Sequence, residues 1–166
     1  MKTLILGVNR NSLPYMVDVA SARRILSERR FRDGWSKLQS TRTHSTWVGL
    51  AFERLCLQHV DQIKRALQIG GVVTNEHAWY SPAAQIDLLI DRDDGIINLC
   101  EMKFAESAYA ISRQESEAVR RKKLALKEET ATKKAVYVTY VTPEGLKRNS
   151  SANDVQSEVT LDDLFN

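Results

Sequence analysis

Residues 85–104 read QIDLLIDRDDGIINLCEMKF, and this stretch decides which fold the chain is expected to adopt. Two apolar segments flank the Asp-Asp-Gly triplet at 93–95, a pattern typical of two antiparallel strands joined by a tight turn. Asp87 interrupts the first segment, and Glu101 and Lys103 interrupt the second. Burying charges costs free energy unless they pair or bind a metal ion, so this hairpin is the candidate functional site.

The length of the turn determines which side chains face one another. A three-residue loop with Gly95 in the left-handed conformation places Asp87 opposite Glu101 on the same face. Lys103 then follows two residues later on that face. A two-residue loop would instead place Asp87 opposite Met102 and separate the charges onto two faces. The Asp-Asp-Gly triplet favours the three-residue loop.

The rest of the chain is expected to supply helices and further strands around this hairpin. Apolar residues recur every three or four positions over 46–69, which predicts a helix, and Gly70-Gly71 is expected to cap it. The remaining predicted elements are strands at 72–80, 85–91, 96–104, 134–142 and 155–160 and a helix at 112–129. This order predicts an α/β fold with a mixed central sheet of four to five strands flanked by helices.

Length and composition indicate one globular domain with an extension. The chain has 166 residues and a net charge of +3, which permits a nucleic-acid partner without requiring one. Residues 46–166 are expected to form the domain, and residues 1–45 a basic, helical N-terminal extension. The two cysteines form no CxxC motif, which favours a reducing, cytoplasmic setting over a disulfide framework. No apolar run is long enough to span a membrane, so no membrane association is expected.

Two opposed carboxylates repel each other, and a divalent cation would turn that repulsion into binding. Mg²⁺ prefers oxygen ligands and commonly uses one or two carboxylates, so Mg²⁺ or Mn²⁺ is expected at Asp87 and Glu101. The backbone carbonyl of Met102 would be a further ligand. Lys103 would orient a water molecule or stabilise charge on a phosphate.

Two more side chains are candidates for the same site. Glu53 lies beside the apolar stripe of the helix predicted over 46–69, so packing against the sheet would bring it towards the metal. The alternative is a solvated Glu53 paired with Arg54 or Lys64. Gln85 precedes Asp87 by two residues and would touch substrate or a ligand water.

At this point the residues resemble a known family. The helical Glu53, Asp87 and the Glu101-X-Lys103 pattern resemble the PD-(D/E)XK nuclease superfamily, which implies a restriction-endonuclease-like core. Several segments look more closely like the C-terminal domain of a group of prokaryotic AAA-type ATPases; they are Trp47–Glu53, Gln85–Ile90, Ile97–Phe104, Thr132–Val136 and Val159–Phe165. The resemblance implies that Glu53, Asp87, Glu101 and Lys103 form the active site.

Two departures from the family pattern limit what the resemblance implies. Ile86 stands where the motif has proline, and no GxxxxGK[ST] phosphate loop occurs in the sequence. An AAA-type ATPase module would therefore be a partner, and a homodimer is a further expected assembly. The expected function is metal-dependent hydrolysis of phosphodiester bonds in nucleic acid, with DNA favoured. The alternative is a module that binds nucleic acid or a partner with little turnover.

A basic run precedes the end of the second predicted helix. Its residues Arg120, Arg121 and Lys122 are the candidates for binding the phosphates of a nucleic acid. The alternative is a solvated helix face that neighbouring glutamates balance.

The aromatic, cysteine and histidine residues are expected to have structural roles. Trp47, Trp79 and Tyr80 are predicted to pack in the core, with stacking on an unpaired base as the alternative. Cys100 is predicted to be a core residue, and His59 a residue of the helix surface.

Overall fold

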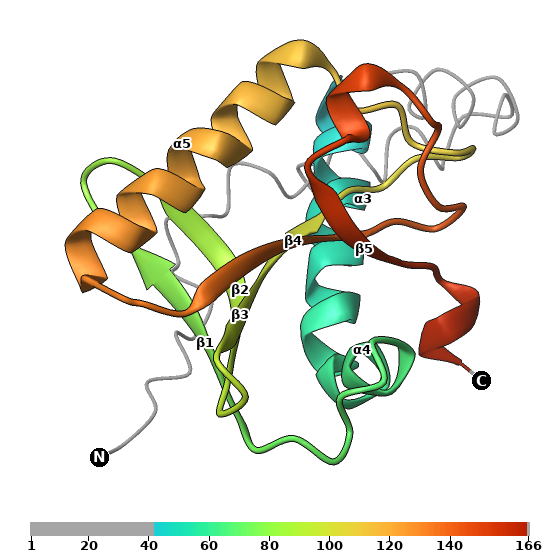
Figure 1. Cartoon of the computed structure of the whole chain (residues 1–166). Helices are drawn as coiled ribbons and strands as arrows, with labels where there is room; N and C mark the ends of the chain where they lie inside the picture. The colour runs from blue at the N-terminus through green and yellow to red at the C-terminus, as the bar shows by residue number, and fades with distance from the viewer. Residues whose placement is uncertain (1–41, 166) are drawn as a thin grey trace, which may run out of the picture. The chain divides into compact units, whose positions relative to one another are not determined.

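The computed structural model describes residues 42–165, with side chains from Ser45 onward, and shows an α/β fold (Figure 1). The helices are α3 (Arg42–Gln58), α4 (Val60–Ala66) and α5 (Arg113–Thr130), and two short 3₁₀ turns are η2 (Ser150–Ala152) and η3 (Asp162–Leu164). The strands are β1 (Thr74–Tyr80), β2 (Gln85–Arg92), β3 (Ile96–Met102), β4 (Ala135–Val141) and β5 (Val155–Val159). The chain divides into two units between Leu50 and Ala51, and the second unit contains the whole sheet.

The five strands form one mixed sheet in the order β1-β2-β3-β4-β5. The first three strands are antiparallel neighbours, whereas β4 lies parallel to β3 and β5 lies parallel to β4. A parallel neighbour needs a crossover connection, and α5 provides it between β3 and β4. β4 reads AVYVTYV, a run of β-branched and aromatic residues that suits a strand covered on both faces. The predicted mixed α/β sheet is therefore confirmed.

Two apolar clusters cover the two faces of the sheet. On one face, α3 and α4 bury Phe52, Cys56 and Ile63 against Leu88, Ile90, Cys100, Met102 and Val141. On the other, α5 buries Val119 and Leu126 against Ile86, Leu89, Leu99, Val138 and Tyr140. Cys100 is 2% exposed, which confirms its predicted place in the core.

The helix predicted over 46–69 is two helices. α3 ends at Gln58, His59 leaves the helical conformation at φ −116° and ψ 32°, and α4 continues to Ala66. The predicted glycine cap is also wrong, because the left-handed residue after α4 is Gln68, with φ 58°. The apolar stripe nevertheless points where it was expected, since Phe52, Cys56 and Ile63 all pack in the core. The spacing of the apolar residues stays regular across the break at His59, so that spacing could not reveal where one helix ends and the next begins.

α5 begins with a capping box. The Ser112 hydroxyl accepts a hydrogen bond from the Glu115 backbone N–H, and the Glu115 carboxylate accepts one from the Ser112 backbone N–H. Ala131, in the left-handed conformation at φ 51°, ends the helix. The helix predicted over 112–129 is therefore confirmed, and its start is fixed by side-chain chemistry that the sequence displays.

The predicted N-terminal extension lies almost entirely outside the described residues. Its last residues, Arg42–Ser45, belong to α3, so that helix includes residues before the start predicted at position 46. No helix in the part of the chain that the structure describes is both long and apolar enough to cross a membrane.

Candidate active site

The β2–β3 hairpin has the predicted three-residue turn. Leu88 pairs with Cys100, and Gly95 in the turn adopts a φ of +86°, in the left-handed region. Continuing this ladder by one residue places Asp87 opposite Glu101. The turn and the register that the Asp-Asp-Gly triplet predicts are therefore confirmed.

Asp87 also lies at a β-bulge, which the sequence did not reveal. The register between β1 and β2 shifts between His77 and Trp79, where two residues of β2 face one residue of β1. Asp87 and Leu88 are those two residues. A bulge redirects the side chains beside it, so alternation along β2 does not by itself determine the direction of the Asp87 carboxylate.

Glu101 is the buried carboxylate of the site, at 7% exposure. Its Oε1 accepts a hydrogen bond from Lys122 Nζ of α5, and its Oε2 lies 3.8 Å from Lys103 Nζ. The two ammonium groups compensate the charge that burial would otherwise make costly. Glu101 is thus held between two lysines.

Glu53 lies within electrostatic reach of this cluster. Burial raises the pKa of the Glu53 carboxyl above its usual value, and the charge of Asp87 raises it further. Glu101 acts in the same direction more weakly, whereas Lys103 and Lys122 lower the pKa. The structure therefore brings together all four predicted catalytic residues, one from a helix and three from the hairpin.

Glu53 and Asp87 are the uncompensated part of the site. Neither carboxylate forms an ion pair with another described residue. The alternative partner Lys64 donates a hydrogen bond of 2.9 Å to Glu76 instead. Gln85 donates one of 2.7 Å to Asp87 Oδ1, as its shared position on β2 suggests, but an amide brings no positive charge. Among the described residues, the two nearby carboxylates therefore have no cation at ion-pair distance, and Lys103 and Lys122 act on Glu53 only from farther away.

The residues present fit a divalent cation in part. Among residues 45–165, no three histidine, cysteine, aspartate or glutamate side chains are arranged as a metal-binding group. Both oxygens of Glu101 face lysine ammonium groups. Asp87 and Glu53, however, have the oxygen chemistry and the uncompensated charge that suit Mg²⁺, which commonly uses only one or two carboxylates. The Met102 side chain packs in the core, and its strand ends at that residue.

A second group of side chains borders the site, and sequence reasoning missed it. The Tyr109 hydroxyl donates a hydrogen bond to Glu115, and the Tyr109 ring stacks on Tyr140 with centroids 6.3 Å apart. Although burial acts to raise it, the pKa of Glu115 is lowered by Tyr109, by Ser112 and by the charge of Lys103. Burial raises the pKa of Tyr140, and the charge of Glu101 adds to this effect. The capping box was the available signal for Glu115, because it fixes that carboxylate at the start of α5.

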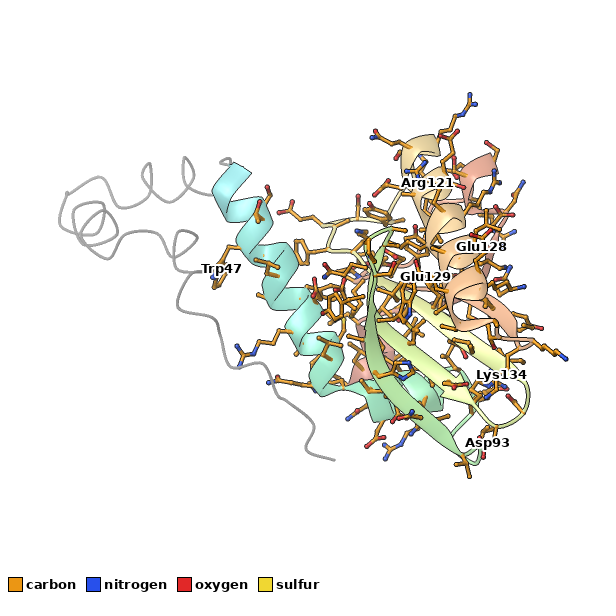
Figure 2. All side chains as sticks on the ribbon, turned by 90° about the vertical axis from the view of Figure 1, so that its left-hand side faces the viewer. Trp47, Asp93, Arg121, Glu128, Glu129 and Lys134 are labelled. Carbon is orange, nitrogen blue, oxygen red and sulfur yellow. The ribbon has the colours of Figure 1, made fainter. Side chains whose placement is uncertain are left out.

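The three basic candidates on α5 have different surroundings. Arg120 is exposed and pairs with Asp154, whereas Arg121 is exposed on the helix (Figure 2). Lys122 turns inward to Glu101. Of the three residues predicted to bind phosphate, Lys122 thus belongs to the candidate-site cluster, a contact that neither alternative for the basic run anticipated.

Of the three aromatic residues predicted to pack in the core, only Trp79 does so. Tyr80 is 60% exposed and Trp47 is 56% exposed, so the core prediction is wrong for both. His59 is not a plain surface residue, because its Nδ1 lies 2.8 Å from the Leu55 carbonyl oxygen and its ring contacts Phe165 edge-on.

Compared with models of known protein families and with curated proteins, the sequence matches none.

Proposed function

We propose that the protein hydrolyses phosphodiester bonds in nucleic acid, with DNA as the favoured substrate, in a divalent-metal-dependent reaction. The observation that carries the proposal is the uncompensated pair Glu53 and Asp87 beside the Glu101–Lys103 pair. A second support is the resemblance of these four residues to the PD-(D/E)XK pattern. We include in the proposal a restriction-endonuclease-like core, which the helix-hairpin-helix-strand order of the mixed sheet supports.

The chain's own residues have distinct roles in this proposal. Glu53 and Asp87 would hold Mg²⁺ or Mn²⁺, with Gln85 orienting the Asp87 carboxylate through its 2.7 Å hydrogen bond. The bound ion would supply a water of lowered pKa and compensate charge on the phosphate. Lys103, whose side chain is 38% exposed, can reach a phosphate from solvent and neutralise charge that develops there.

Glu101 is assigned the role of positioning the lysines. Because it is buried and contacts both Lys103 and Lys122, it fixes two ammonium groups beside the place where a phosphate would lie. A Glu101 oxygen becomes available to a metal only if a lysine moves away from it. The ligand set Asp87, Glu101, Glu53 and the Met102 carbonyl stays a prediction.

The test is a cleavage assay with labelled single-stranded DNA, duplex DNA and RNA in Mg²⁺ or Mn²⁺. Wild-type protein should cut at least one of them, and Lys103→Ala should not, because it lacks the exposed ammonium group. Lys134→Ala is the matched control, since Lys134 pairs with Asp91 of β2 instead. Equal cleavage by wild type and Lys103→Ala would attribute the activity to a contaminant and reject the proposed site.

A second candidate function is a binding module without turnover, docked on nucleic acid or on an AAA-type ATPase. The observation that favours it is the pairing of both Glu101 oxygens with lysines, which reduces the set of free ligands. This candidate predicts salt-sensitive binding of nucleic acid without cleavage in either metal. The same assay, repeated as a binding titration at several salt concentrations, separates the two functions.

A further inference from the structure

Two aromatic rings are exposed at the end of the sheet that carries the candidate active site. Tyr80 ends β1, and its partner across the ladder is Gln85. Gln85 in turn donates its hydrogen bond to Asp87. Tyr80, whose ring is 60% exposed, is therefore the ladder partner of the residue that hydrogen-bonds Asp87.

The second ring belongs to Phe104, which directly follows Lys103. Phe104 is 41% exposed, and its ring contacts Phe52 edge-on with centroids 5.9 Å apart. Phe52 is the buried neighbour of Glu53 on α3. One edge of Phe104 is thus held by the core beside the site while part of the ring remains in contact with solvent.

In the strand order, β2 with Asp87 lies between β1, which Tyr80 ends, and β3, just beyond which Phe104 lies. The end of β1, the start of β2 and the end of β3 all lie at the same end of the antiparallel sheet. Tyr80 is on the β1 side of Asp87, and Phe104 lies on the β3 side with Lys103. A nucleic acid that crosses this end of the sheet from β1 to β3 would therefore pass both rings, with Asp87 between them and Lys103 beside Phe104.

We propose that this site takes single-stranded nucleic acid, with bases on either side of the bound phosphate stacking on Tyr80 and Phe104. Bases in a duplex already stack on one another, whereas an unpaired strand offers its base faces to aromatic side chains. Lys103 and Lys122 supply the positive charge that follows a nucleic-acid backbone. The inference rests on the proposed function for the position of the phosphate, and it adds the class of substrate.

The test measures binding without cleavage. A labelled short single-stranded DNA and the blunt duplex of the same sequence are titrated with protein in EDTA and low salt, and anisotropy is recorded. Wild-type protein should bind the single strand more tightly than the duplex. Tyr80→Ala should weaken single-strand binding by about five- to a hundredfold, the range for losing one stacked base, and leave duplex binding unchanged.

Matched variants separate stacking from other effects. Tyr80→Phe should bind like wild type, because stacking needs the ring and not the hydroxyl. Phe104→Leu keeps apolar contact with Phe52 but removes the ring, so it should also weaken single-strand binding. Tyr137→Ala removes a ring of 38% exposure that lies on β4 opposite Asn98, away from Glu101, and it should change nothing.

Two results would overturn the inference: duplex binding at least as tight as single-strand binding, or a Tyr80→Ala variant that binds like Tyr137→Ala. Each outcome is distinguishable from failure of the proposed function when cleavage in Mg²⁺ is measured on the same variants. Duplex cleavage that Tyr80→Ala leaves intact would keep the hydrolase and reject the stacking site. Ring-dependent binding without any cleavage would keep the stacking site and reject the hydrolase.

Discussion

The two ends of the β2–β3 hairpin both carry charged side chains, but they differ in how those charges are compensated. At the turn end, Lys134 Nζ lies 2.6 Å from Asp91 Oδ1, and Arg92 pairs with Asp94. The buried Asn98 donates a hydrogen bond of 3.1 Å to Thr139. Figure 2 places Lys134 at this end of the sheet together with Asp93 of the turn. Apart from the exposed Asp93, each of these groups has an ion-pair or hydrogen-bond partner, so the turn end has a structural explanation.

At the opposite end of the same hairpin, two carboxylates have no ion-pair partner among the described residues. Burial and the charge of Asp87 raise the pKa of Glu53, and of the site's three described carboxylates only Glu101 forms ion pairs with lysines. A charged residue inside an apolar strand is therefore not by itself a sign of function, because both ends have one. The uncompensated carboxylate pair is the feature that distinguishes the site.

The largest expected difference between the two ends is in catalysis. Asp87→Asn keeps the shape of the side chain and removes its charge, so we expect cleavage to slow by about 10²–10³-fold, the scale for losing one group that stabilises transition-state charge. Asp91→Asn makes the same change at the turn end and should leave the rate unchanged. Initial cleavage rates on one labelled DNA measure both. Comparable losses in the two variants would mean that the effect is one of folding.

The second-largest expected difference between the two ends of the hairpin is in metal binding. At free Mg²⁺ about a hundred times its Kd, binding to the native state alone stabilises wild type by about 2.7 kcal/mol, which raises Tm by several degrees. Glu53→Gln and Asp87→Asn should lose this shift, since each removes a proposed ligand. Asp94→Asn, at the turn, should keep it. Thermal unfolding with Mg²⁺ and with EDTA gives the shift, and an equal shift in all four proteins would place the ion elsewhere.

Substitutions of two neighbouring basic residues on α5 test how the end of the hairpin that carries the candidate site is stabilised. Lys122→Met keeps the aliphatic stem but leaves the buried Glu101 with only Lys103, 3.8 Å away, so it should cost about 1–3 kcal/mol. Arg120→Met removes an exposed pair with Asp154 and should cost about 0–1 kcal/mol. Urea denaturation measures both free energies of unfolding. Equal costs would show that the Lys122–Glu101 contact adds no stability.

The comparison also shows what the sequence could determine. The hairpin register was predictable because the Asp-Asp-Gly turn leaves few geometries, and the place of Glu53 followed from the helical stripe that begins at Phe52. The bulge at Asp87 was not predictable, because it depends on the register with β1, a strand with little apolar alternation of its own. The contact of Lys122 with Glu101 depends on how α5 lies across the sheet, which no local pattern encodes. The exposure of Tyr80 likewise depends on how other elements pack around the end of β1, which no local pattern encodes.

The smallest expected difference is in the pH dependence of stability, where the two ends should respond with opposite signs. Because the pKa of Glu53 is raised by folding, the native state holds a proton that the unfolded chain has lost, and stability falls as pH rises through that interval. In EDTA, Glu53→Gln should therefore match wild type in acid and be more stable near neutrality.

Asp94 at the turn should behave in the reverse way. Its hydrogen bond from Arg92 holds its pKa below the usual range, so ionised Asp94 stabilises the native state near neutral pH, and this contribution is lost as pH falls through the lowered pKa. Asp94→Asn should be less stable than wild type near neutrality and equal to it in strong acid. Denaturation midpoints measured across this pH range give both signs. If Glu53→Gln were also destabilising near neutrality, the carboxylate would have a cationic partner after all, and the contrast between the two ends would disappear.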